Sequence, residues 1–403
     1  MHSTRPTWSL AIAGAAILAV TMGIRQSLGL FVSPLNTSTG LGIVTVSFTL
    51  AVAQFVWGAA QPVFGAIADR VGPVRVMMAG GLLLAIGLVA TPFMSSALGL
   101  VFFLGVLTAA GAGAGSFSIL IGAAANRIAP EKRSFASGFI NAGGSFGQFV
   151  FAPLSQALIA TMGWIAAFWA LAVAALATIP MSLAFRERRD EPAHGATAPG
   201  LSLSGQVSAA FRDPSYWCLH AGFFTCGFHI AFLVTHLPGE VALCGLPASV
   251  SAASLAIIGL ANIAGSLGAG WLGQAHRMKW ILFWMYGTRA AAIAVYLVLP
   301  KTTATFYAFA AVLGLTWLAT VPPTAGLVGK LFGTRFLATL FGLTLLSHQI
   351  GGFFGAWLGG LAIAYTGSFD WMWYADMALA AAAAVVNLPI REAHPRPAAA
   401  PSS

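Results

Sequence analysis

Charge is scarce in this sequence. Only 7% of its 403 residues are Asp, Glu, Lys or Arg, whereas 58% are hydrophobic and the mean hydropathy is +0.86. Soluble domains carry about 25% charged residues, so the composition excludes a soluble globular protein. The three cysteines (Cys218, Cys226 and Cys244) are odd in number and lack the spacing of metal ligands, so we expect neither a disulfide framework nor a metal site.

Catalytic signatures are also missing. The chain has no H-E-x-x-H, no G-x-S-x-G and no nucleotide-binding P-loop, and no pair of carboxylates lies within an apolar run. These absences argue against an enzyme or an ATP-driven pump, and nothing in the sequence calls for a cofactor. A membrane receptor or enzyme is the most distant alternative.

What the sequence has is apolar runs, each long enough to cross about 30 Å of hydrocarbon at about 1.5 Å per residue. The first run lacks a small-residue cleavage site, so we expect it to be retained as a span. The sequence thus predicts an all-α membrane protein with twelve transmembrane helices. The predicted spans 1 to 12 are residues 8–34, 45–66, 75–93, 98–123, 134–159, 163–184, 215–238, 248–272, 280–299, 303–327, 336–361 and 371–390.

The basic residues are distributed unevenly about these spans. Of the 19 Lys and Arg residues, sixteen fall on one side when the spans are taken in order, and Lys301 alone falls on the other. The positive-inside rule then places both termini in the cytoplasm. The net charge of +9 therefore reports topology, not nucleic-acid binding. We expect a monomeric, multi-pass protein of the cell (inner) membrane, surrounded by lipid.

The spans divide into two groups of six. "FRERRDEPAHGATAPGLSLSGQ" (185–206) is the long polar stretch between them, which predicts an N-terminal bundle over residues 1–190, a cytoplasmic linker over 191–212 and a C-terminal bundle over 213–403. "GAIADRVGPVR" after span 2 is echoed by "GWLGQAHRMK" after span 8, about 205 residues later, and "KRSFASGF" by "TRFLATLFG", about 202 residues later. Matching offsets indicate a duplicated six-helix unit.

"GAIADRVGPVR" (65–75) resembles the loop 2–3 motif of the major facilitator superfamily, matching it at Gly65, Asp69, Arg70, Gly72 and Arg75. The resemblance covers essentially the whole chain. It implies a fold of two six-helix halves with a substrate site between them near the membrane midplane. It also implies that the Asp and Arg of this loop act as a conformational latch between helix ends. The alternative is a solvated turn.

A narrower resemblance follows at "EKRSFASGFINAGGSFG" (131–147), which is similar to the signature of the monocarboxylate transporters and bacterial oxalate/formate antiporters. Lys132 and Arg133 match its basic pair and extend the predicted latch. This family commonly has a lysine about six residues before a phenylalanine in span 1, where Arg25 precedes Phe31 here. Animal members carry an Asp and an Arg in span 8, where this chain has Asn262 and Ser266. The resemblance implies transport of a small organic anion, a monocarboxylate, by proton symport or by exchange for a counter-anion.

Arg25 lies inside span 1, and burying an arginine in a membrane costs about 2.5–3.5 kcal/mol. No Asp or Glu lies in spans 1, 2, 4, 5, 7, 8, 10 or 11, so the sign of the site favours an anion. A drug or metabolite efflux facilitator of the same fold is the alternative function. The alternative for Arg25 itself is a permanent bond to carbonyls, to Gln26 or to the polar face of span 5.

Polar residues recur at helical spacing on spans 2, 5, 8 and 11. Amides facing lipid would lack hydrogen-bond partners, so these faces should point to a cavity or to another helix. His229 and His348 could bind the anion, carry a proton or bond a backbone carbonyl as neutral histidines. The predicted substrate-binding residues are Arg25, Gln26, Gln54, Asn141, Gln148, His229, Asn262, Trp317 and His348.

Two further features concern the outer helices. Arg289 in span 9 and Asp376 in span 12 are predicted to form a structural ion pair, because both are embedded in helices that are neighbours in this fold. Pro322 and Pro323 should kink span 10 just below Trp317.

Overall fold

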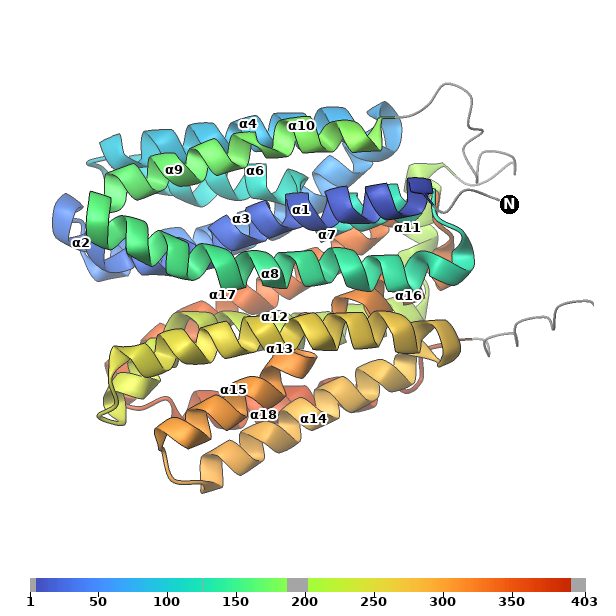
Figure 1. Ribbon diagram of the computed structural model, residues 1–403. Helices are drawn as coiled ribbons and strands as arrows, with labels where there is room; N and C mark the ends of the chain where they lie inside the picture. Colours follow the sequence, from blue (N-terminus) through green and yellow to red (C-terminus); the bar gives the residue numbers. More distant parts are fainter. Residues whose placement is uncertain (1–4, 126, 187–201, 393–403) are drawn as a thin grey trace, which may run out of the picture.

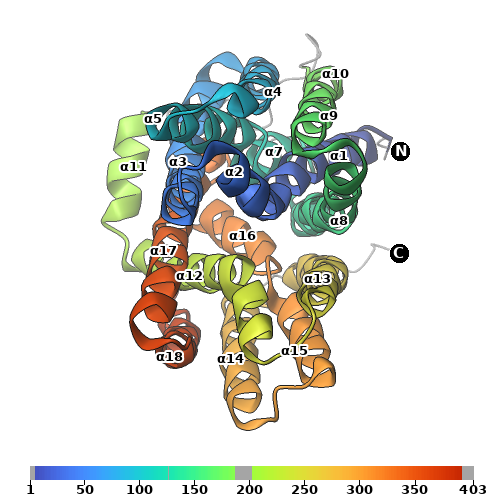
Figure 2. The ribbon, with the colours of Figure 1, turned by 90° about the vertical axis from the view of Figure 1, so that its left-hand side faces the viewer.

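The computed structural model describes residues 5–125, 127–186 and 202–392. Its helices run side by side, and those of the first half (blue to green) lie on one side of those of the second half (yellow to red) (Figures 1 and 2). The first half contains α1 (Arg5–Ser27), η1 (Leu28–Phe31), α2 (Val32–Thr39), α3 (Ile43–Val71), α4 (Pro73–Ala90), η2 (Thr91–Phe93), α5 (Ala97–Leu100), η3 (Val101–Thr108), α6 (Ala109–Ala114), α7 (Phe117–Ala125), α8 (Pro130–Met162), α9 (Trp164–Leu176), α10 (Thr178–Ser182) and η4 (Leu183–Phe185).

The second half repeats this arrangement after a short connecting helix. Residues 191–201 of the predicted linker lie outside the described residues, and the remainder contains the whole of this helix, α11, at one end of the bundle (Figure 1). We call this end the α11 end. The elements are α11 (Leu203–Phe211), α12 (Pro214–Leu243), α13 (Ala248–Ala275), α14 (Met278–Val298), α15 (Thr303–Thr316), α16 (Val321–Phe332), α17 (Leu337–Thr366) and α18 (Asp370–Val386).

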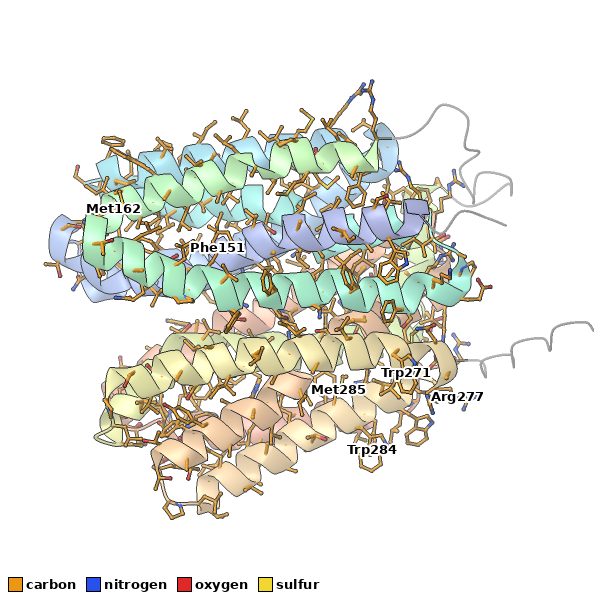
Figure 3. The ribbon with its side chains drawn as sticks, viewed as in Figure 1. Phe151, Met162, Trp271, Arg277, Trp284 and Met285 are labelled. Carbon is orange, nitrogen blue, oxygen red and sulfur yellow. The ribbon has the colours of Figure 1, made fainter. Side chains whose placement is uncertain are left out.

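Twelve membrane-spanning helices are present among the described residues, as the sequence predicts. Ten segments are long and apolar enough to cross a membrane by length and composition alone. The other two are α8, which begins with the charged run Glu131–Arg133 and carries a polar face, and α18, which has only 17 residues. Large apolar side chains cover the outside of the bundle: Met162, Trp271 and Trp284 are each at least 65% exposed (Figure 3). Such a surface suits lipid.

Several spans are not regular α-helices throughout. Span 10 ends as α15 at Thr316 and restarts as α16 at Val321, immediately before Pro322 and Pro323. Proline lacks an N–H group and clashes with the preceding turn, so the predicted kink is confirmed as a full break. The 3-10 turn η1 in span 1 and the π-helical stretch η3 in span 4 were not expected.

The two halves meet mainly along two pairs of helices, with smaller contacts of α7 with α17 and of α8 with α16. α3 packs against α17, and α8 packs against α13. Within the second half, α12 and α17 approach so closely that a Cβ atom on Gly227 would overlap the carbonyl oxygen of His348. Gly351 and Gly355 meet the backbone of α12 in the same way. Small residues allow membrane helices to approach this closely, and here they let the backbones of α12 and α17 pack directly against each other.

Candidate functional site

Arg25 lies near the end of α1 and reaches across to both α3 and α17. Its Nη2 donates hydrogen bonds to Oε1 of Gln54 on α3 and, at 3.1 Å, to Oε1 of Gln349 on α17. The guanidinium carbon lies 4.2 Å from the centroid of the Trp57 ring, a cation–π distance. The structure thus joins Arg25 to one predicted residue, Gln54. It adds two partners, Trp57 and Gln349, that were absent from the predicted site, and Gln349 belongs to the other half.

The surroundings of Arg25 are polar but uncharged. None of the ion pairs within the described part of the chain includes Arg25. Amide dipoles and an indole face offset only part of the cost of placing a guanidinium in a membrane. The expected alternative, a bond to Gln26, is wrong in this structure, because the Gln26 amide instead donates to Gln148 on α8 at 3.1 Å. The positive charge of Arg25 has no counter-ion from the described residues.

His348 extends this site along α17. Its Nδ1 lies 2.6 Å from Nε2 of Gln349, the residue that binds Arg25. Because an amide N–H donates, this ring nitrogen accepts, and the proton of the neutral ring is on Nε2. That second nitrogen is buried and has no partner among the described residues. Arg25, Gln349 and His348 therefore form a chain that ends in an unused donor.

Asn141 and Asn262 take part in a contact between the halves. Asn141 Nδ2 donates to Ser266 Oγ at 2.7 Å and to the Leu318 carbonyl at 2.8 Å. Asn262 Nδ2 donates to Ser145 Oγ at 2.5 Å, while its Oδ1 accepts the Leu318 N–H at 3.0 Å. Both asparagines are fully buried. Neither faces an open cavity here, so the alternative of hydrogen bonding between helices describes them in this structure.

A cavity lies between the halves toward the α11 end. Its volume is about 330 Å³, and it is lined by parts of α7 and α8 from one half and of α13 and α16 from the other. Ile140 and Pro322, at its inner wall, are neighbours of the contact between Asn141 and Leu318. Two cationic residues, Arg133 and Lys330, also line it. The cavity is thus separated from Arg25 by the polar contact between the halves.

The predicted latch also reaches the other half. Asp69 Oδ2, near the end of α3, accepts hydrogen bonds from Oγ1 of Thr339 at 2.6 Å and from its N–H at 3.3 Å, at the start of α17. Gly65 packs directly on the backbone of Ala338, and Gly72 ends α3 with φ +90°. The solvated-turn alternative is therefore wrong for Asp69. The basic members Arg70, Arg75 and Lys132 are exposed, whereas Arg133 donates to the carbonyl of Ile128 at 2.9 Å.

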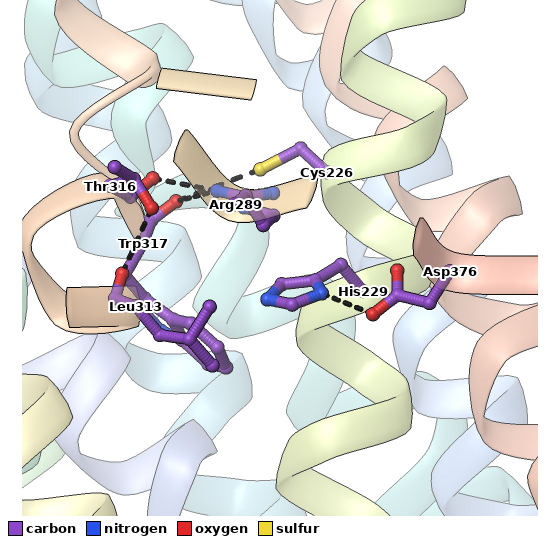
Figure 4. A network of polar contacts seen from close by, with 7 residues as sticks. All are labelled: Cys226, His229, Arg289, Leu313, Thr316, Trp317 and Asp376. Carbon is purple, nitrogen blue, oxygen red and sulfur yellow. Dashed lines mark hydrogen bonds and ion pairs between the residues drawn. The ribbon is translucent and has the colours of Figure 1, made fainter. Parts of the chain in front are cut away.

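The predicted pair of Arg289 with Asp376 is wrong. Asp376 Oδ2 lies 2.5 Å from Nδ1 of His229 on α12, and both side chains are fully buried (Figure 4). Arg289 Nη2 donates instead to the carbonyls of Thr316 and Trp317, at 2.6 and 3.0 Å. The reason is the break in span 10: a helix ends with carbonyls that have no partner within the helix, and Arg289 supplies the missing donor.

His229 and Trp317 lie in this cluster of the second half rather than beside Arg25. The two rings are 5.7 Å apart, and the Trp317 carbonyl accepts a weak bond from the Cys226 thiol at 3.7 Å. Several buried polar atoms of the cluster have no partner among the described residues. They are His229 Nε2, Asp376 Oδ1, Trp317 Nε1, Arg289 Nε and Arg289 Nη1.

Two six-helix halves that meet around a buried polar centre are an arrangement typical of membrane transporters. Residues 10–356 match the sequence model of the Major Facilitator Superfamily. The chain belongs to this family, and the superfamily named from its loop motif is confirmed.

Relatives and solved structures agree with this assignment. The chain is 25% identical to Monocarboxylate transporter 13 of Rattus norvegicus over 92% of its own length and 86% of the relative. It is also 25% identical to the Oxalate:formate antiporter of Oxalobacter formigenes, over 90% and 86%. The fold matches the proton:xylose symporter XylE bound to 6-bromo-6-deoxy-D-glucose with a TM-score of 0.75, at 13% identity and over 98% of both chains. This last likeness concerns the fold alone.

Proposed function

We propose that the protein is a secondary active transporter that moves a small organic anion, a monocarboxylate, across the membrane by alternating access. One observation carries this proposal: Arg25 lies within a membrane span, and its partners among the described residues are neutral amides and an indole. A carboxylate would supply the missing negative charge. The planar guanidinium suits it, because two of its N–H groups can bind both carboxylate oxygens at once.

The names of the relatives support the same class of substrate, since both refer to carboxylates. The energy would come from a proton moving with the anion or from exchange for a counter-anion. We further propose that the α11 end faces the cytoplasm of the cell, in the inner membrane, with both termini on that side. The distribution of the 19 Lys and Arg residues supports this orientation.

The anion would bind between the halves, at Arg25, Gln54 and Gln349, with the unused Nε2 donor of His348 close by along α17. Release toward the cytoplasm would pass through the cavity at the α11 end. The bond from Asn141 to the Leu318 carbonyl lies between these two places, so it must break when the site opens inward. Asp69 would act as a latch in the same movement.

A thermal-shift screen of the purified protein against formate, L-lactate, pyruvate and oxalate tests this proposal. A ligand at about 100 times its dissociation constant stabilises a protein by about 2.7 kcal/mol, so a transported carboxylate should raise the melting temperature. Arg25→Gln should melt near the wild-type temperature without ligand and lose the shift. Arg391→Gln removes an exposed cation and should keep it. If no carboxylate stabilises the wild type, or if Arg25→Gln keeps the full shift, the proposal is wrong.

A further inference from the structure

We propose that His229 and Asp376 form a proton-binding site, separate from the anion site at Arg25, and that its occupancy is coupled to anion transport. The coupling rests on the proposed function, whereas the site itself rests on the geometry of the cluster. The two side chains come from α12 and α18, and Figure 4 shows His229 turned toward Asp376.

The pair has the capacity for one further proton. Nδ1 of His229 and Oδ2 of Asp376 share a hydrogen at 2.5 Å. The outer atoms of the pair, Nε2 and Oδ1, are buried and have no partner within the described part of the chain. With a neutral imidazole and an ionised carboxylate, the pair carries one negative charge. A proton taken from water onto either outer atom makes the pair neutral and forms one N–H or O–H bond.

The charges around the pair explain why protonation would respond to an anion. Asp376 and Arg289 are the charged groups that act on His229. Arg289 balances Asp376, so an added proton leaves the cluster with one net positive charge in a buried place, which is unfavourable. A bound carboxylate near Arg25 would lower that cost. The other titratable groups close to the cluster are Cys226 on α12, Tyr286 on α14 and His348 on α17.

Two structural connections link the pair to the rest of the transporter. The first runs along α12, where Gly227 lies against the His348 carbonyl two residues before His229. His348 is within electrostatic reach of both Arg25 and Arg289. The second runs through the break in span 10. The Trp317 ring packs on His229, and the next residue, Leu318, bonds Asn141 of the other half. Protonation can therefore bias both the anion site and the contact that must open.

Proteoliposomes containing the purified protein test this inference with radiolabelled L-lactate and formate as probes. Three quantities are compared: binding by thermal shift, exchange of probe at equal concentrations and pH, and uptake driven by an imposed pH gradient. At saturating probe concentration, His229→Gln and Asp376→Asn should still bind and exchange the probe but lose about tenfold or more of the gradient-driven uptake. His236→Gln is the matched control, because this histidine lies on the same helix and bonds a backbone carbonyl, that of Ala356, instead of a carboxylate; it should behave as wild type.

The outcomes separate this inference from the proposed function. Gradient-driven uptake that persists in both variants, or a wild type that only exchanges, overturns the proton site and leaves the anion site standing. Loss of all probe binding in the wild type overturns the anion proposal instead. If the wild type binds no probe, or if Asp376→Asn does not fold, the proton site is tested by ¹⁵N-histidine NMR instead. Comparison of the wild type with His229→Gln identifies the signal of the His229 ring. A His229 ring that keeps one protonation state between about pH 5 and about pH 8 overturns the proton site.

Discussion

Two arginines lie within the membrane-spanning helices of this transporter, and their surroundings differ in both burial and charge. Arg289 is fully buried, donates to two backbone carbonyls and lies in a cluster that contains the carboxylate of Asp376. Arg25 is only half-buried, and its partners are the amides of Gln54 and Gln349 and the ring of Trp57.

The difference supports the proposal that Arg289 serves the fold and Arg25 binds the ligand. A buried charge is stable in a protein when its hydrogen bonds and a compensating charge are built in. Arg289 has two hydrogen bonds to carbonyls and a carboxylate in the same cluster, all within one half of the molecule, so these contacts can persist while the halves move. Arg25 draws its partners from both halves, and the residues that the structure describes supply no counter-ion for it.

The first prediction is that Arg289 contributes far more than Arg25 to the free energy of unfolding. Arg289→Met removes the donor at the end of α15 and leaves the Asp376 carboxylate without its compensating cation. We expect the free energy of unfolding to fall by about 3–5 kcal/mol, measured by chemical denaturation in detergent. Arg25→Met should cost less than about 1 kcal/mol, because it removes a charge that lacks a counter-ion. Equal losses would contradict the distinction.

The second prediction concerns ligand affinity. Arg25→Lys keeps the charge but loses the planar fork, so the dissociation constant of a bound carboxylate should rise by about 10- to 100-fold, equivalent to about 1.5–3 kcal/mol. Isothermal titration with the carboxylate that gives the largest thermal shift measures this change. Arg289→Lys serves as the control and should leave the dissociation constant within about threefold of wild type in the folded fraction. An unaltered affinity in Arg25→Lys would place the anion elsewhere.

A third variant tests a contact between the halves that is remote from both arginines. Asp69→Asn weakens the bond with Thr339, which should slow transport by shifting the balance between inward and outward states. The carboxylate dissociation constant should change by less than tenfold, or about 1.4 kcal/mol. Transport rate and titration on the same preparation measure the two effects. Arg391→Gln, at an exposed side chain outside this motif, should transport nearly as wild type.

The smallest effect is expected where a charge pair faces water. Asp213 caps α12 by accepting the Ser215 N–H at 2.8 Å, and it lies 2.9 Å from Nη2 of Arg391. Burial alone would raise the pKa of Asp213, but these hydrogen bonds and the charge of Arg391 hold the pKa below its ordinary value.

The stabilisation from Asp213 is therefore present at neutral pH and disappears as the pH falls through this lowered pKa. Asp213→Asn should keep the cap and cost less than about 1 kcal/mol. Melting curves between neutral and acidic pH should show the wild type and Asp213→Asn converging as the solution becomes acidic. A difference that grows toward acidic pH would reverse the sign of the argument.

The sequence was sufficient for features that depend on length and spacing. Twelve spans follow from the apolar runs, the broken span 10 follows from Pro322 and Pro323, and the position of Asp69 at the interface follows from its motif. Residue partners inside the bundle depend instead on how each helix is rotated about its axis, and one residue changes that direction by about 100°.

This rotation accounts for the two main differences at the candidate site. α14 and α18 are neighbours as expected, yet Arg289 turns toward the end of α15 and Asp376 turns toward α12. Gln349 follows His348 by one residue and therefore lies off the polar face formed by Thr344 and His348, although it is Gln349 that bonds Arg25. In the sequence, the signal that could have identified Gln349 as a partner of Arg25 was its position directly after the polar residue His348.

The backbone of Leu318 carries a consequence for the speed of transport. Its N–H and its carbonyl are both bonded to side-chain amides, one of which, Asn141, belongs to the opposite half. When the halves separate, the hydrogen bond between this carbonyl and the Asn141 amide breaks deep in the membrane, where a polar group without a hydrogen bond is costly in free energy. Water must enter and hydrate them as the gap widens. In the proposed transport cycle the opening step would therefore be a wetting transition, and osmotic stress, which withdraws water, should slow turnover without weakening anion binding.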